Sequence, residues 1–294
     1  MAQPQPIAKL IDMSALAERL RGLKKSGDNR DFTMTSERRR ATSRATSDCP
    51  FNLCDGSGLI IRIIDGFEIA RFCKCHEQQE IDRRFRSAAI PAEFSALTIA
   101  AFSIDRYRKP DNRKRAYAAK KIAVNYVEQF RVMQSKGKGL YLYGRVKGSG
   151  KTRLAASMAN ALIRKYSISA KFITTVDFFN EIRATFDRET GICASDLIDA
   201  ARQVDLLILD DIGTEKQESP WVNETMYAVL DHRMNQRKTT MFTSNCTIES
   251  LLHNDKIKSR IERMVLPVWM PEEEIRADLA RAENEELQKL LLGV

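Results

Sequence analysis

The sequence predicts an α/β fold built on a parallel sheet, preceded by a small cysteine-rich hairpin. Two stretches indicate the sheet. Residues 139–162 read as a strand, a Gly-rich loop and a helix, and the almost wholly apolar residues 204–209 end in Asp210 and Asp211. Around these stretches candidate strands and helices alternate, as is typical of parallel sheets. The hairpin is predicted from four of the six cysteines, which fall between residues 49 and 75.

Length and charge set the limits of the prediction. A chain of 294 residues can bury one sizeable core and still carry a small extra domain. Its net charge of +9 favours an acidic partner such as nucleic acid. No apolar run approaches the length of a membrane span, and residues 1–6 show no basic region followed by an apolar core. We therefore expect a cytoplasmic protein with no membrane partner.

Residues 1–48 are expected to form an N-terminal amphipathic helix and a flexible basic linker. Apolar residues recur at three- and four-residue steps over residues 7–25, a pattern that predicts a short helix. Its apolar stripe must dock either on the rest of the chain or on a partner, and the sequence does not favour one of these two possibilities. Residues 25–48 are polar and rich in Ser, Thr and Arg, so they predict a linker. Within it Arg38–Arg40 could touch phosphates, although such runs are more often solvated.

The cysteine-rich stretch, residues 49–88, predicts a zinc-binding module. Strand-like residues 59–64 and 67–72 flank an Asp-Gly turn, so a hairpin would bring two cysteine pairs together. Four thiolates at one point suit tetrahedral Zn²⁺, and the candidate ligands are Cys49, Cys54, Cys73 and Cys75. His76 is an alternative to Cys75. Unligated buried cysteines or a redox pair are the other interpretations.

A basic stretch follows a break at Ile90–Pro91. Between Arg106 and Lys121 eight Lys or Arg residues stand against one Asp. As a basic patch with Tyr107 and Tyr117 among its residues, this stretch could contact a nucleic-acid backbone. The same residues fit the start of a surface helix over about 112–134, which is the favoured interpretation. Its inward residues would be Ala116, Ile122, Ala123, Tyr126, Val127 and Phe130.

The Gly-rich loop has the features of a phosphate-binding loop. Strand, loop and helix in that order place backbone N–H groups and a helix N-terminus around one point. Lys151 would reach the β- and γ-phosphates, and the Thr152 hydroxyl would bind Mg²⁺. The strict motif requires glycine at position 145, where the chain has Arg145, and Gly144 lies one residue too early. The alternative interpretation is a Gly-rich turn that precedes Lys151 and Thr152 by chance and binds no phosphate. The predicted nucleotide-binding residues of the loop are Gly148, Ser149, Gly150, Lys151 and Thr152.

The second strong signal is the carboxylate pair that ends an apolar strand. Such a strand would bring Asp210 and Asp211 to the carboxyl edge of the sheet, beside the phosphate loop. Asp210 would hold Mg²⁺, and Asp211 would orient or deprotonate the attacking water. Asp pairs at strand ends also occur as helix caps or turn formers. Asn245, after the strand over residues 239–244, would bond the γ-phosphate or the water.

The remaining elements are assigned by periodicity. Predicted strands are 170–175 and 265–270, and Pro267 favours an edge position for the second. Predicted helices, taken in chain order, are 77–89, 176–186, 194–203, 258–263 and 271–294.

Together these motifs resemble one family: the AAA+ ATPases that load replicative helicases, the DnaC/DnaI group, with the related IstB transposition ATPases. The resemblance extends from about Cys49 to Arg276. It implies a P-loop AAA+ three-layer fold with a five-stranded parallel sheet over residues 89–276, and a C-terminal helix over 277–294. A cysteine cluster before the ATPase looks most like the DnaI-type loader. The most specific residues are Leu206–Glu215, Trp221, Arg233 and Thr243–Asn245.

The resemblance implies roles that spacing alone does not. Asn245 matches the sensor-1 position. Arg260 matches the arginine finger, which reaches the ATP site of a neighbouring subunit, and Arg263 is a competing candidate. Arg276 matches the sensor-2 arginine that contacts the γ-phosphate in its own subunit. Without the resemblance, surface charge on helices would explain all three arginines.

The function implied is that of an ATP-dependent helicase loader in DNA replication, with ATP, Mg²⁺ and Zn²⁺ as cofactors. Its expected partners are a replicative ring helicase, held by residues 1–88, single-stranded DNA, and further copies of itself in an ATP-dependent homo-oligomer. Two departures from the family pattern bear on activity. The loop is one residue longer, which bears on nucleotide affinity. Asp211 stands where many members carry Glu, and its side chain is one methylene shorter, so slow hydrolysis is expected.

Two alternatives remain open at this point. One is a transposition helper ATPase with the same catalytic parts and duplex DNA as its track. The other is a DNA-binding regulator that binds nucleotide without hydrolysing it.

Overall fold

The computed structural model describes residues 49–64, 67–186, 193–214 and 220–292. The chain divides into two units, Met1–Thr46 and Ser47–Val294, and all described residues belong to the second. The amphipathic helix and the linker predicted before Cys49 lie outside the described residues.

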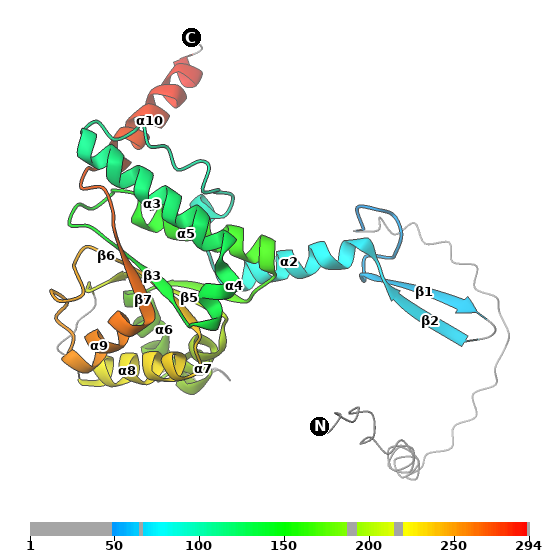
Figure 1. Cartoon of the computed structure of the whole chain (residues 1–294). Helices are drawn as coiled ribbons and strands as arrows, with labels where there is room; N and C mark the ends of the chain where they lie inside the picture. Colours follow the sequence, from blue (N-terminus) through cyan, green and yellow to red (C-terminus); the bar gives the residue numbers. More distant parts are fainter. Residues whose placement is uncertain (1–48, 65–66, 187–192, 215–219, 293–294) are drawn as a thin grey trace, which may run out of the picture. The chain divides into compact units, whose positions relative to one another are not determined.

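A five-stranded, wholly parallel sheet forms the centre of the α/β part (Figure 1). Its order is β4-β5-β6-β3-β7, so the predicted fold class is confirmed. Pro267 pairs with Tyr141 and lies in β7, an edge strand, where its missing N–H costs no ladder bond. The strands are β3 (Gly139–Tyr143), β4 (Ala170–Thr174), β5 (Leu206–Ile212), β6 (Thr239–Ser244) and β7 (Val265–Trp269).

Helices cover both faces of this sheet and give three layers. Alternate strand residues enter two separate cores: Leu140 and Leu142 enter one, and Tyr141 enters the other. Because both faces are buried, β3 and the first part of β5, Leu206–Leu209, are continuous apolar runs. The first core takes residues from α2 (Lys74–Ala88), α3 (Pro110–Glu128), α4 (Phe130–Ser135) and α5 (Lys151–Tyr166). The second takes residues from α6 (Thr175–Ala184), α7 (Ala194–Gln203), α8 (Pro220–Asn235) and α9 (Asp255–Met264).

The predicted hairpin precedes these layers. Strands β1 (Leu59–Ile64) and β2 (Phe67–Phe72) are antiparallel, and α2 follows directly. Ala88, at the end of α2, is buried in the first core. A short 3-10 helix, η1 (Ala92–Phe94), leads on toward α3. None of the helices in the described ranges combines the length and apolar character needed to cross a bilayer.

Two helix predictions need correction. The helix expected over 112–134 is interrupted at Gln129, and Ile122 is 38% exposed although it was expected to face inward. The C-terminal helix, α10 (Arg276–Leu292), begins five residues later than expected from Pro271. Glu273 does not open it because its carboxylate accepts hydrogen bonds from Arg108 and Lys109, far away in the sequence.

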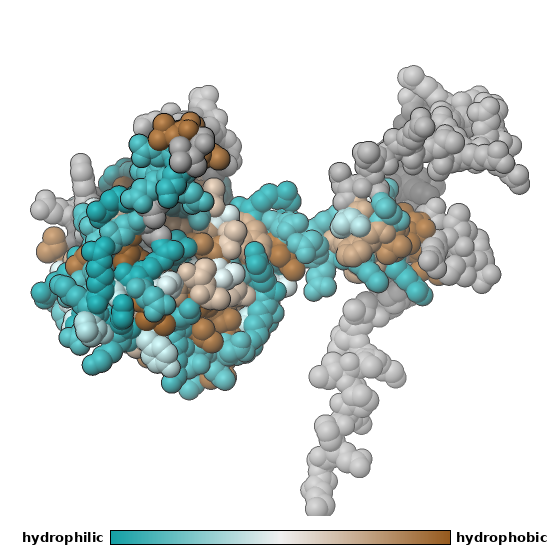
Figure 2. Space-filling view, turned by 90° about the horizontal axis from the view of Figure 1, so that it is seen from above, coloured by the Kyte–Doolittle hydropathy of each residue, from teal (hydrophilic) through white to brown (hydrophobic). Residues whose placement is uncertain are grey.

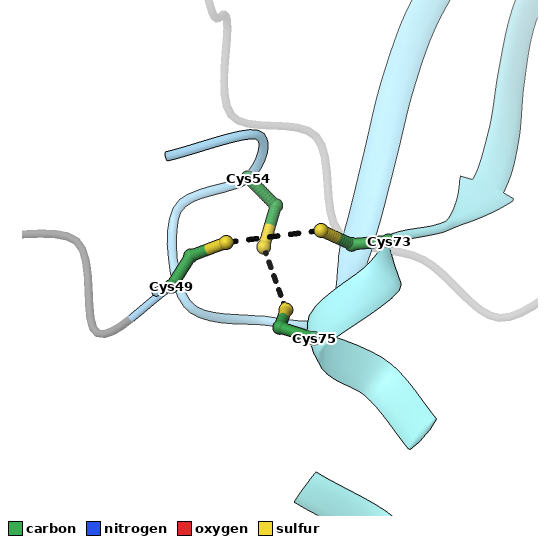
Figure 3. A group of neighbouring side chains, drawn as sticks. All are labelled: Cys49, Cys54, Cys73 and Cys75. Atoms are coloured by element: carbon green, nitrogen blue, oxygen red, sulfur yellow. Dashed lines mark hydrogen bonds between the residues drawn. The ribbon is translucent and has the colours of Figure 1, made fainter. Parts of the chain in front are cut away.

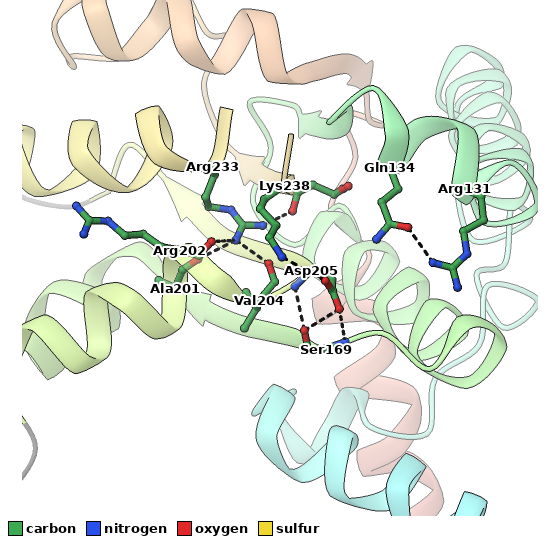
Figure 4. A network of polar contacts seen from close by, with 10 residues as sticks. Arg131, Gln134, Ser169, Ala201, Arg202, Val204, Asp205, Arg233 and Lys238 are labelled. Atoms are coloured by element: carbon green, nitrogen blue, oxygen red, sulfur yellow. Dashed lines mark hydrogen bonds and ion pairs between the residues drawn. The ribbon is translucent and has the colours of Figure 1, made fainter. Parts of the chain in front are cut away.

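A buried arginine joins three elements on the side of the second core (Figure 4). The guanidinium of Arg233, on α8, donates to the carbonyl oxygens of Ala201 and Val204, both at 2.8 Å, and of Thr239 at 2.5 Å. Its Nε donates to the Thr240 hydroxyl at 2.9 Å. One fully buried side chain thus satisfies carbonyls at the end of α7 and the start of β6.

Candidate nucleotide site and cysteine cluster

A cavity of about 760 Å³ opens at the carboxyl ends of the parallel strands. Its lining comes from the loop between β3 and α5, the ends of β4, β5 and β6, η1 and α10. This is the edge where ligands bind in open α/β sheets. Every residue of the predicted phosphate loop from Gly148 to Thr152 lines it, as do Asp210, Asp211, Asn245 and Arg276.

Two glycines let the loop turn tightly. Gly148 and Gly150 have φ angles of +70° and +93°, in the left-handed region that favours glycine. A Cβ on Gly148 would lie 3.1 Å from side-chain atoms of Glu274 and Arg276. One on Gly150 would lie 3.1 Å from Phe102 and from the Tyr107 hydroxyl. Larger residues would therefore strain the backbone and crowd neighbours on both sides.

Lys151 begins α5 and lies inside the loop. It is 7% exposed, and its Nζ donates to the carbonyl oxygens of Gly144 at 3.0 Å and Val146 at 2.9 Å. The additional residue at Arg145 therefore does not stop the loop from closing around the lysine. Burial lowers the pKa of Lys151, while the carboxylates of Asp211 and Asp210 oppose that change.

Asp210 is held between two hydroxyl groups. It is 6% exposed, and its carboxylate accepts hydrogen bonds from Thr243 at 2.6 Å and Thr152 at 3.2 Å. Burial raises the pKa of Asp210, although both hydrogen bonds act in the opposite direction. A buried carboxylate beside a hydroxyl at the mouth of a phosphate loop is a donor set that fits Mg²⁺.

Asp211 has an unusual backbone. Its φ is +57°, and the pairing register between β5 and β6 shifts between Leu209 and Ile212. The Asp211 N–H donates to the Thr243 hydroxyl at 2.9 Å, and Asn245 Nδ2 donates to its carboxylate at 2.7 Å. A left-handed non-glycine residue costs energy, so the surrounding bonds must hold it there. The carboxylate and amide that sequence patterns placed at adjacent strand ends do meet in the cavity.

The three arginines singled out in the sequence separate into two groups. Arg276 lines the cavity, whereas Arg260 and Arg263 do not. Arg260 donates to the Asp231 carboxylate at 2.6 and 2.8 Å, and its guanidinium lies 4.0 Å from the centre of the Tyr227 ring. Arg263, on the same helix, is exposed.

Sequence patterns missed several residues that shape the cavity. Thr243 belongs to the Thr-Ser-Asn stretch but was given no role, and it bonds both aspartates. The Tyr107 hydroxyl donates to the Ser149 carbonyl at 2.8 Å, and Glu273 binds the segment after Tyr107. No local pattern could reveal the last two, because their partners lie 42 and about 165 residues away.

The four predicted cysteines form a cluster at the base of the hairpin (Figure 3). Their sulfur atoms all lie within 4.8 Å of one another. The Cys49 and Cys73 sulfurs are 3.7 Å apart, and those of Cys54 and Cys75 are 3.4 Å apart. Tetrahedral Zn²⁺ with bonds of about 2.3 Å requires sulfurs about 3.8 Å apart, so the four thiols fit the metal.

His76 is not part of this cluster. Its ring packs against Phe72 in a tilted arrangement, with ring centres 4.2 Å apart. Burial raises the pKa of Cys49, but backbone N–H groups, including those of Leu53 and Cys54, lower it to about 6. Such N–H groups stabilise a thiolate, the form that binds a metal. The geometry favours Cys75 over His76 as the fourth donor.

Comparisons with known proteins agree with this architecture. Residues 77–257 match the protein family described as IstB-like ATP binding protein. Over 129 residues the chain is 36% identical to the replicative helicase loader DnaI of Bacillus subtilis (strain 168), covering 44% of this chain and 40% of that protein. Over 150 residues it is 27% identical to the replicative helicase loader DnaC of Escherichia coli (strain K12), covering 50% of this chain and 58% of DnaC.

A solved structure supports the same relationship. A candidate primosome component from Streptococcus pyogenes serotype M3 aligns with a TM-score of 0.51 and 26% identity, covering 66% of this chain and 96% of that one. The match to the two loaders is confined to between 40% and 58% of their own length.

Proposed function

The chain belongs to the family of IstB-like ATP binding proteins, and on that premise we propose that it is an ATPase that loads a replicative ring helicase onto single-stranded DNA. One observation supports the proposed ATPase activity. A single cavity gathers a phosphate loop with its lysine, a hydroxyl beside a buried carboxylate, a second carboxylate bonded to an amide, and an arginine. These are the parts that phosphoryl transfer to water requires.

Nucleotide binding is assigned to the loop. Backbone N–H groups of Gly148, Ser149 and Gly150 surround the phosphates, and Lys151 exchanges its two carbonyl partners for phosphate oxygens. Thr152 and Asp210 would hold Mg²⁺, which would neutralise part of the phosphate charge. Arg276, which lines the cavity next to Gly148, binds the γ-phosphate.

Hydrolysis is assigned to Asp211 and Asn245. Asp211 orients the attacking water and takes its proton, while Asn245 holds the carboxylate through the 2.7 Å bond. Aspartate is one methylene shorter than the glutamate found in many AAA+ proteins. Turnover is therefore slow, which suits a switch that waits for a partner.

Self-assembly is assigned to Arg260, which completes the ATP site of a neighbouring subunit. Its absence from its own cavity supports this role. To act there the side chain must exchange Asp231 and Tyr227 for phosphate oxygens. The positive charge binds the phosphates of the neighbouring subunit's ATP and completes that site, so the oligomer depends on ATP.

Helicase binding is assigned to residues 1–88, with Zn²⁺ holding the hairpin through Cys49, Cys54, Cys73 and Cys75. The described part of this region exposes large apolar side chains, a feature of protein interaction sites (Figure 2). These are Phe51, Leu53, Ile61 and Phe72, each about half exposed or more. Single-stranded DNA is bound through its backbone phosphates, so that affinity falls steeply with salt.

The test is co-purification with the replicative helicase, with and without ATP, together with direct binding of ATP and of single-stranded DNA. We expect capture of the helicase that depends on residues 1–88, and an ATP-dependent assembly that Arg260→Ala abolishes. A purified protein that bound neither ATP nor single-stranded DNA at moderate salt would contradict the proposal.

A second candidate, a transposition helper ATPase, is favoured by the description of the matching family. The same catalytic parts would then act on duplex DNA. A strong preference for duplex over single-stranded DNA, with no helicase captured, would select this function. Asp211→Asn separates either ATPase from a regulator that only binds nucleotide, because the variant should bind ATP and lose activity.

A further inference from the structure

Two segments far apart in the sequence contact the phosphate loop from outside. The Tyr107 hydroxyl donates to the Ser149 carbonyl at 2.8 Å. The Ile275 N–H donates to the Gly148 carbonyl at 3.0 Å. Tyr107 is fully buried, and Ile275 is immediately followed by Arg276, which lines the cavity. The two contacts therefore fix the conformation of adjacent peptide groups in the loop.

One carboxylate joins these two segments to each other. Glu273 accepts hydrogen bonds from the Arg108 N–H at 2.8 Å, the Lys109 N–H at 3.2 Å and Asn112 Nδ2 at 3.1 Å. The Asn112 side-chain oxygen in turn accepts from the Glu272 N–H at 3.0 Å. We call Arg108, Lys109, Asn112 and Glu273 the clasp. The clasp constrains the two loop contacts directly, because Arg108 adjoins Tyr107 and Glu273 lies two residues before Ile275.

We propose that Glu273 is a positioning residue for the nucleotide, holding Tyr107 and Ile275 together so that the phosphate loop and Arg276 stay arranged for ATP. The proposal rests on the proposed function, since it assumes that ATP occupies this cavity. Glu273 itself does not line the cavity. It acts through backbone contacts and needs no direct bond to the nucleotide.

A purely structural role makes a different prediction. The Glu273 carboxylate lies at the N-terminus of α3, where negative charge stabilises a helix. If that were its whole role, Glu273→Ala would lower the melting temperature of the nucleotide-free protein and leave nucleotide affinity unchanged. The clasp predicts weaker ATP binding at temperatures where the variant is fully folded.

The experiment is a double-mutant cycle on ATP affinity, measured calorimetrically with the full chain. Glu273→Ala should weaken ATP binding about ten-fold, the size expected for losing hydrogen bonds to one charged group. Tyr107→Phe removes only the hydroxyl and should weaken binding by a similar factor. Both substitutions act on the same loop, so their effects should not add. The ATP affinity of the double variant should lie within about two-fold of that of the more affected single variant.

The matched control is Glu285→Ala, which removes an exposed carboxylate from α10 that does not line the cavity, and it should bind like the wild type. Affinity within two-fold of wild type for Glu273→Ala, or fully additive losses in the cycle, would overturn the clasp. If Glu273→Ala does not fold, Glu273→Gln, which keeps the shape and loses the charge, is judged by the same criteria. A wild-type chain that binds no ATP overturns the proposed function itself, and with it the clasp.

Discussion

At the scale of single residues, the buried carboxylate of Asp210 lowers the stability of the folded, nucleotide-free protein at neutral pH. Burial raises its pKa, so the folded nucleotide-free protein holds this proton more tightly than the unfolded chain does. The free energy of unfolding therefore falls as pH rises from the unfolded pKa through the folded one. Above that window the ionised carboxylate is a cost that bound Mg²⁺ would offset.

Asp210→Asn should therefore have opposite effects on stability and on binding. At neutral pH the nucleotide-free variant should melt at the same or a higher temperature than wild type, because a buried charge is gone. The further rise in melting temperature that ATP gives wild type in the presence of Mg²⁺ should disappear. Differential scanning fluorimetry with and without Mg²⁺ and ATP checks both. An undiminished ligand-induced rise would contradict the role given to Asp210.

Thr243 supports both aspartates with one hydroxyl. It accepts from the strained Asp211 N–H and donates to Asp210. Thr243→Val keeps the shape but removes both bonds, so we expect at least a ten-fold loss in the rate of ATP hydrolysis. Thr243→Ser keeps the hydroxyl and should retain most of the rate. Equal losses in the two variants would contradict the role given to the hydroxyl, because Thr243→Ser keeps it.

At the scale of elements, Arg233 holds α7, α8 and β6 together. Arg233→Met would leave the carbonyl groups of Ala201, Val204 and Thr239 without this donor in a buried region. We expect the free energy of unfolding to fall by about 3 kcal/mol or more, measured by urea denaturation. Arg281→Met, at an exposed arginine of α10, is the matched control and should change little. A loss below about 1 kcal/mol for Arg233→Met would contradict this assignment.

The hairpin is the element that should depend on metal. We expect about one equivalent of Zn²⁺ per chain after gentle purification, and less than about half an equivalent for Cys73→Ser. Cys193→Ser, at an exposed cysteine outside the cluster, should keep its zinc. Elemental analysis of the three proteins is the measurement. A wild-type chain with under half an equivalent would argue against a structural metal.

At the scale of the whole molecule, the sequence predicted those features that depend on local patterns. The strand ending in Asp210 and Asp211, the helix beginning at Lys151 and the hairpin were all recognisable, because apolar runs, glycines and cysteine pairs mark them directly. The parallel sheet followed from the alternation of strands and helices. The same logic brought Asn245 beside Asp211, since parallel strands end at one edge.

What the sequence could not show depends on contacts between distant segments. The Glu272–Glu274 run looks like a helix start, yet the helix begins only at Arg276 because Glu273 is engaged by the start of α3. Similarly, Ile122 fits the inward periodicity of α3 but lies on its outer side. The partner of a carboxylate 165 residues away leaves no trace in local spacing.

The central claim is that this cavity binds ATP through its phosphate loop, and the most direct measurement is calorimetric titration of ATP with Mg²⁺ into wild type and Lys151→Ala. We predict one ATP per chain for wild type. Without the Lys151 ammonium group, affinity should fall at least about ten-fold, because one buried charge on the phosphates is lost. Equal affinity in the two proteins, or no binding by wild type, would contradict the account.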